Sequence, residues 1–160
     1  MKGDLTMSLL KNLEESFIFK RGMKVEGANF TGDAWFEPLI PYDGLNETLI
    51  YNVTFAPNAR NFWHTHPGGQ ILLVTAGEGW YQEKGKPAQR IKAGDAIRIL
   101  PNVEHWHGAA SDSWMVHIGE TVMPGLGDTW FTGEKVTDEY YSKLREDTRT
   151  GNMKKTEIQK

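Results

Sequence analysis

The sequence has no cysteine among its 160 residues, so disulfide bonds and thiolate metal ligands are both excluded. No apolar run approaches the roughly 20 residues that a membrane-spanning helix needs. The formal net charge is only −3, which gives no indication of a nucleic-acid or membrane-surface partner. Residues 1–16 lack the apolar core and cleavage site of a secretory signal. We therefore expect a cytoplasmic protein that can bind a metal ion only through nitrogen and oxygen atoms.

The length is that of one domain large enough to bury a core. The expected organisation is a flexible lead-in over residues 1–16, a single domain over 17–145 and a polar tail over 146–160. A short helix is predicted near the C-terminus, because Thr137 is a good N-cap and two acidic residues follow it.

Most of the domain consists of short β-forming runs separated by glycine, proline, asparagine or aspartate. Tyr51, Val53 and Phe55 alternate with polar residues and predict one buried strand face. Residues 70–75 form a continuous apolar strand, which the glycines at 77 and 79 are expected to bend before it continues. Many short strands with frequent turns predict a sandwich or barrel rather than alternating β–α units.

All five histidines lie between residues 64 and 117. His64 and His66 point the same way if they lie on one strand, and two adjacent imidazoles are costly to bury unless they bind a partner such as a metal. A turn at residues 67–69 brings Gln70 to the pair, and a later strand adds His105. These four neutral donors are candidates for one ion, with coordination positions left open for substrate. The alternative is a pair of surface histidines beside an ordinary strand glutamine.

Two motifs carry a resemblance to the cupins, and they read His64-x-His66-x3-Gln70-x6-Gly77 and Gly94-Asp95-x5-Pro101-x3-His105. The resemblance covers residues 46–121. It implies an all-β fold, the double-stranded β-helix or jelly-roll barrel, with a short C-terminal helix added here and one divalent metal inside. The chain departs from the common cupin pattern at Gln70, where most members have glutamate.

The glutamine variant, with Trp-His-Thr-His-Pro and His-Trp-His-Gly-Ala-Ala, is similar to the bacterial manganese-dependent cupin hydroxynitrile lyases. This resemblance implies a manganese ion, with iron, zinc or nickel as alternatives, bound by four ligands: His64, His66, Gln70 and His105. It also implies two further pocket histidines as catalytic residues, His107 and His117.

The roles of the remaining pocket residues are open to more than one interpretation. His107 shares the inward face of His105, and it is either a general base or a histidine that orients its neighbours. His117 lies among apolar residues, where a buried core histidine is the alternative to a catalytic one. Tyr51, Val53 and Thr121 are expected to contact the substrate.

The predicted function is that of a metal-dependent, lyase-type enzyme acting on a small organic molecule. Without a glutamate ligand the site keeps the full positive charge of the ion, which favours reactions that develop negative charge or release a small anion. A cupin dioxygenase and a non-catalytic metal- or ligand-binding module are the alternatives. Tryptophans and edge strands predict a homodimer or homotetramer, and no nucleic-acid or membrane partner is expected.

Overall fold

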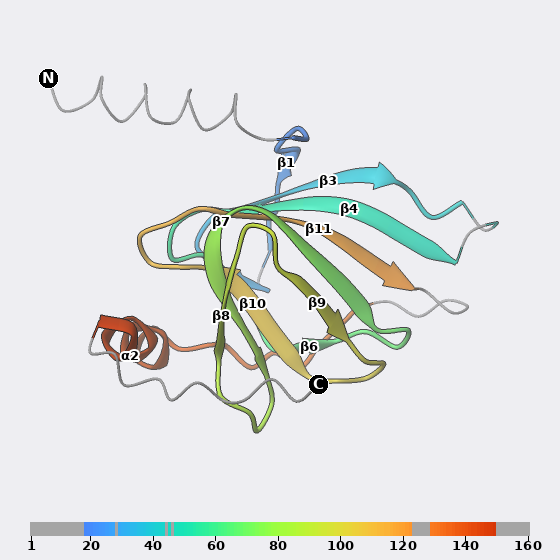
Figure 1. Cartoon of the computed structure of the whole chain (residues 1–160). Coiled ribbons are helices and arrows are strands. Elements are labelled where there is room, and N and C mark those ends of the chain that lie inside the picture. Colours follow the sequence, from blue (N-terminus) through green and yellow to red (C-terminus); the bar gives the residue numbers. More distant parts are fainter. Residues whose placement is uncertain (1–17, 28, 44, 46, 123–128, 150–160) are drawn as a thin grey trace, which may run out of the picture.

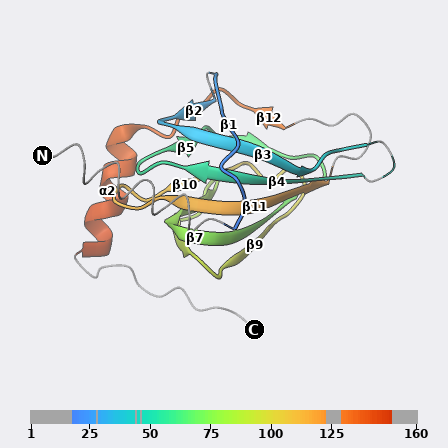
Figure 2. The ribbon, with the colours of Figure 1, turned by 90° about the horizontal axis from the view of Figure 1, so that it is seen from above.

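Two curved antiparallel sheets face each other and close into a barrel, with a helix packed outside it (Figures 1 and 2). The computed structural model describes residues 18–27, 29–43, 45, 47–122 and 129–149. Within these residues the elements are β1 (Met23–Lys24), β2 (Phe30–Thr31), β3 (Ala34–Ile40), β4 (Thr48–Phe55), β5 (Arg60–Asn61), β6 (His64–Thr65), β7 (Gln70–Glu83), β8 (Gln89–Lys92), β9 (Ala96–Ile99), β10 (His105–Ala109), β11 (Met115–Val122), β12 (Trp130–Phe131) and α2 (Asp138–Arg149). The predicted jelly-roll barrel with a short C-terminal helix is confirmed.

Strand β7 joins the two sheets. Its first half pairs with β9 and β11, and its second half, from Glu78 onward, pairs with β8 and β10. Gly77 marks the change of sheet with a φ of +70°, and a Cβ added there would lie 1.7 Å from the carbonyl oxygen of Trp114. The predicted bend is therefore present, and the chain stays in strand geometry through it.

The core lies between the sheets and is built from the inward faces of β4, β7 and β11. Tyr51, Val53 and Phe55 are buried on the predicted face of β4, and they pack with Leu72 and Val74 of β7. The polar residues between them point to the other side of the sheet. This alternation places the inward residues of three neighbouring strands around one interior space.

Helix α2 begins where the sequence predicts, because Thr137 Oγ1 accepts a hydrogen bond from the backbone N–H of Tyr140 at 3.2 Å. Tyr141 and Leu144 are buried in a second apolar cluster with three tryptophans of the barrel, Trp63, Trp80 and Trp106.

The helix continues to Arg149, so it enters the segment 146–160 that was predicted as a tail. The lead-in over residues 1–16 lies outside the described residues. In the part of the chain that is described, no helix is long and apolar enough to cross a membrane.

Candidate metal centre

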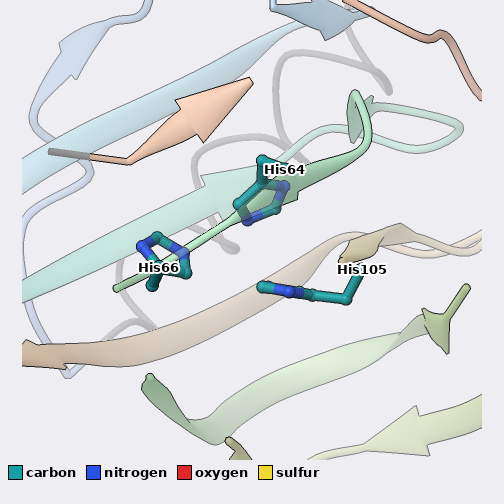
Figure 3. Close-up of side chains that lie close together, drawn as sticks. All are labelled: His64, His66 and His105. Carbon is teal, nitrogen blue, oxygen red and sulfur yellow. The ribbon is translucent and has the colours of Figure 1, made fainter. Parts of the chain in front are cut away.

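Three buried histidines converge inside the barrel where β6 and β10 lie side by side (Figure 3). His64 of β6 and His105 of β10 are direct cross-strand partners, and His66 follows β6 in the chain. One ring nitrogen from each residue lies within 4.8 Å of the other two, and none of the three side chains is more than 3% exposed. A buried group of this kind in a barrel without thiols indicates a site for a metal ion.

A tight turn after His66 brings Gln70 to the histidines. The sequence predicts His64 and His66 on one strand, but strand β6 ends at Thr65 and His66 lies just after it. The two rings stand at 89° to each other. The backbone N–H of Gly69, at φ +81°, donates to the His66 carbonyl oxygen at 3.0 Å. Strand β7 therefore starts at Gln70, whose side chain is buried beside the rings.

The orientation of two of the rings is fixed from outside the group. In His64 and in His105, Nδ1 donates to the backbone carbonyl oxygen two residues earlier, at 2.9 Å in both cases. A carbonyl oxygen only accepts, so Nδ1 carries the proton and Nε2 carries the lone pair. In His66, Nδ1 lies 3.1 Å from the hydroxyl of Thr129, and Nε2 has no hydrogen-bond partner among the described residues. Each ring thus has Nε2 available as a metal ligand.

The orientation of the Gln70 amide shows whether a cation fits between this side chain and the histidines. Its Nε2 donates to the hydroxyl of Tyr51 at 2.6 Å, which turns Oε1 toward His105 Nε2 at 3.0 Å. Because the His105 proton is on Nδ1, both of these atoms are acceptors, and no proton lies between their lone pairs. A bound cation satisfies both atoms, whereas a hydrogen bond cannot. Three imidazole nitrogens and an amide oxygen form a donor set that suits a divalent transition-metal ion.

Burial keeps the ligand histidines neutral. Loss of solvation lowers the pKa of His66 to about 3 and that of His105 to about 4. It also holds the pKa of His64 well below its usual value, with further lowering by the neighbouring imidazoles. The neutral imidazole is the form that binds metals, so these shifts prepare the group for an ion.

A cavity of about 560 Å³ opens onto His64, His66 and Gln70, and most of its wall is apolar. Its size is within the usual range of small-molecule sites. The three residues predicted to contact substrate, Tyr51, Val53 and Thr121, all line it. The apolar wall also includes four phenylalanine rings, those of Phe30, Phe36, Phe55 and Phe131.

His107 lines the same cavity, with its ring centroid 5.5 Å from that of His64. Burial holds its pKa well below the usual value, and the other histidines lower it further. Asn61 favours one tautomer of this ring: its Oδ1 accepts from the backbone N–H of His107 at 2.9 Å, so Nδ2 faces the ring, 3.1 Å from Nε2 and 3.5 Å from Nδ1. An amide nitrogen only donates, so Nε2 of His107 carries the lone pair.

His117 lies next to His107, on the side away from the three converging histidines. Its ring stacks on Phe55 with centroids 6.0 Å apart and meets the ring of His107 edge-on at 5.0 Å. Burial lowers its pKa to about 4. His107 lines the cavity, whereas His117 is not among the described residues that line it.

Two residues that hold the site, Asn61 and Thr129, were not predicted. Each contacts a histidine far away in the sequence, through a strand pairing that only the closed barrel creates: β5 with β10 for Asn61, and β12 with β6 for Thr129. Both lie in or next to strands of two residues, which are too short to give a periodic pattern. No signal in the sequence marks either residue.

Known proteins resemble this chain in both sequence and fold. A family model described as a cupin domain matches residues 51–122. An (R)-mandelonitrile lyase of Granulicella tundricola is 42% identical over 113 residues, which are 70% of this chain and 85% of that protein. The crystal structure of a cupin-like protein of Thermotoga maritima is 50% identical with a TM-score of 0.75, over 79% of this chain and 96% of that one. A predicted oxalate decarboxylase of the same organism, 19% identical with a TM-score of 0.58 over 64% and 91% of the chains, shares the fold alone.

Proposed function

This chain belongs to the cupin superfamily, and from that premise we propose that it is a metal-dependent lyase of the hydroxynitrile lyase type. The observation that carries the proposal is the group of three Nε2 atoms and one amide oxygen beside an apolar cavity. The similarity to a mandelonitrile lyase supports the choice of reaction. The reaction would split a cyanohydrin into an aldehyde and hydrogen cyanide.

The proposed ligands of the ion are His64, His66, Gln70 and His105, and manganese is the proposed ion. All four side chains are neutral, so a bound divalent ion supplies a Lewis-acidic centre with its full charge. Acceptors outside the group hold two of the rings and the amide in fixed orientations: the carbonyl oxygens of Phe62 and Val103 and the hydroxyl of Tyr51.

His107 is the proposed general base. Its Nε2 faces the amide nitrogen of Asn61, and a substrate hydroxyl that replaces this amide at Nε2 can give its proton to the lone pair there. The hydroxyl proton passes to Nε2, the C–O bond becomes a carbonyl, and cyanide leaves with the electron pair of the C–C bond. Burial disfavours the imidazolium, so the proton then moves on to cyanide and His107 returns to its neutral form.

The cavity favours a substrate with an aromatic group. Four phenylalanine rings of the wall can pack against an apolar substituent: Phe30, Phe36, Phe55 and Phe131. Two of these phenylalanines lie beside the histidines, with ring centroids 5.7 Å apart for Phe55 and His107 and 5.2 Å apart for Phe131 and His64. An aryl cyanohydrin with its ring against these phenylalanines therefore has its hydroxyl and nitrile within reach of the histidines.

The test is cyanide release from each enantiomer of mandelonitrile by protein loaded with manganese, with metal-stripped protein as the control. We expect release that requires the metal, and that falls roughly 10²- to 10⁴-fold in His107→Ala, the usual effect of removing a general base. His107→Ala should bind manganese as the wild type does. A metal-loaded protein that releases no cyanide above the stripped protein would contradict the proposal.

The same samples separate the alternatives. Oxygen consumption by iron-loaded protein would favour a dioxygenase, and metal binding without either activity would favour a binding module. Each outcome needs only the metal content, a cyanide assay and an oxygen electrode.

A further inference from the structure

The hydroxyls of Tyr51 and Thr121 are bonded to the protein. Tyr51 OH accepts from Gln70 Nε2 at 2.6 Å and lies 2.9 Å from Thr121 Oγ1. With the amide nitrogen donating to its oxygen, the Tyr51 hydroxyl can direct its own proton to Thr121. The three side chains form one buried chain of hydrogen bonds, each from a different strand.

The three hydrogen-bonded side chains lie on three adjacent strands of the barrel. Strand β11 lies between β4 and β7, with Gly119 opposite Tyr51 and Thr121 opposite Gln70. A Cβ on Gly119 would lie 2.3 Å from the Tyr51 ring, so only glycine lets the ring cross β11 at this point. Phe36 stacks on the ring at a centroid distance of 5.1 Å and an interplanar angle of 29°. The ring is thus held between a backbone and a second ring, with its hydroxyl at the amide.

An amide ligand needs such a device more than a carboxylate does. Either oxygen of a glutamate can bind a cation, whereas only one end of a glutamine can, and a rotation of the amide by half a turn presents the nitrogen instead. Tyr51 distinguishes the two ends when its own proton goes to Thr121, because its hydroxyl then offers the amide only a lone pair and pairs with the nitrogen.

We propose that Tyr51 and Thr121 are positioning residues that hold the amide oxygen of Gln70 on the metal. This inference rests on the metal centre of the proposed function and is independent of the reaction. Their main role is then to support the ligand, with any contact to substrate secondary.

The experiment is a double-mutant cycle on metal affinity, read by calorimetry on the full chain with manganese and with zinc. Tyr51→Phe should weaken binding by about 10- to 100-fold, the usual effect of removing a partner that orients a ligand. In a Gln70→Ala background the same substitution should change affinity by less than about twofold, since no amide remains to be held. Zinc is included because three histidines suffice to bind it, so metal affinity can still be measured in the Gln70→Ala background.

Two further variants separate positioning from a general structural effect. Thr121→Val should also weaken metal binding, and Thr121→Ser, which keeps the hydroxyl, should restore it. Tyr81→Phe is the matched control: this buried tyrosine beside His105 donates to Glu83 rather than to a ligand, so metal affinity should not change.

The outcomes are distinct. Wild-type affinity in Tyr51→Phe, or an equal loss with and without Gln70, overturns the inference. A coupled loss of affinity in a protein that releases no cyanide supports the inference and contradicts the lyase instead. If Tyr51→Phe does not fold, the Thr121→Val and Thr121→Ser pair decides on the same readout.

Discussion

Gln70 decides the charge of the site. The three histidines could have been predicted as metal ligands from their spacing, and the glutamine from its place after the turn. Its orientation could not, because the hydroxyl that sets it comes from a strand two positions away in the sheet. The sequence thus identifies the candidate donors, and the fold decides which atom of each candidate faces the others.

Gln70→Glu should make the site a poorer receptor for anions. The variant adds a negative charge next to the ion, and a unit charge 4 Å away is worth about 4 kcal/mol at an effective dielectric constant near 20, before solvent relaxation. We expect the affinity of the manganese-loaded protein for thiocyanate or azide to fall at least about tenfold, measured by calorimetry.

Gln82→Glu is the matched control for this change. Gln82 Oε1 accepts hydrogen bonds from Trp106 and Tyr140, which a carboxylate can keep, and only the exposed bond from its Nε2 to the Lys86 carbonyl oxygen is lost. Its anion affinity should stay near the wild-type value. Equal losses in the two variants would show that overall charge, rather than ligand charge, governs anion binding.

At the scale of elements, the long strands could be predicted from the sequence and the short ones could not. Strand β4 has alternating residues and β7 a continuous apolar run, so both are visible as patterns. Strands β5, β6 and β12 have two residues each and exist because neighbouring strands pair with them. These short strands carry or neighbour His64, Asn61 and Thr129, so the less predictable elements are the ones that complete the site.

Gly77→Ala should damage the joint between the two sheets. An alanine at φ +70° costs about 1–2 kcal/mol for the left-handed backbone alone. Its Cβ would also lie 1.7 Å from the Trp114 carbonyl oxygen, so β7 or β11 has to move. We expect a loss of stability several times larger than the backbone cost, measured by urea unfolding, together with weaker metal binding.

Gly85→Ala separates the two causes. Gly85 has a similar φ of +78° in the hairpin after β7, and a Cβ there would meet no atom within 4 Å. This variant should lose only the stability that a left-handed alanine backbone costs, and it should bind metal normally. If both variants unfold at the same urea concentration, close approach at the joint contributes nothing.

At the scale of the whole molecule, the barrel buries every histidine of the chain. In each of them burial is the largest cause of a lowered pKa, and the value is about 3 in His66 and about 4 in His105 and His117. An unfolded chain has ordinary histidines that bind protons below about pH 6.5. Between pH 6.5 and the lowered pKa values the unfolded state therefore holds more protons than the folded state, and stability falls as the pH falls.

The metal-stripped protein should accordingly lose stability steadily from pH 7 to about pH 4.5. Each histidine that is protonated only when unfolded contributes a slope of up to about 1.4 kcal/mol per pH unit. His117→Phe removes one such group and keeps a ring stacked on Phe55, so its slope in this range should be shallower by about that amount. Urea unfolding followed by tryptophan fluorescence at several pH values measures both slopes. Equal slopes in the variant and the wild type would mean that His117 is protonated to the same extent in both states, which its burial beside Phe55 and His107 argues against.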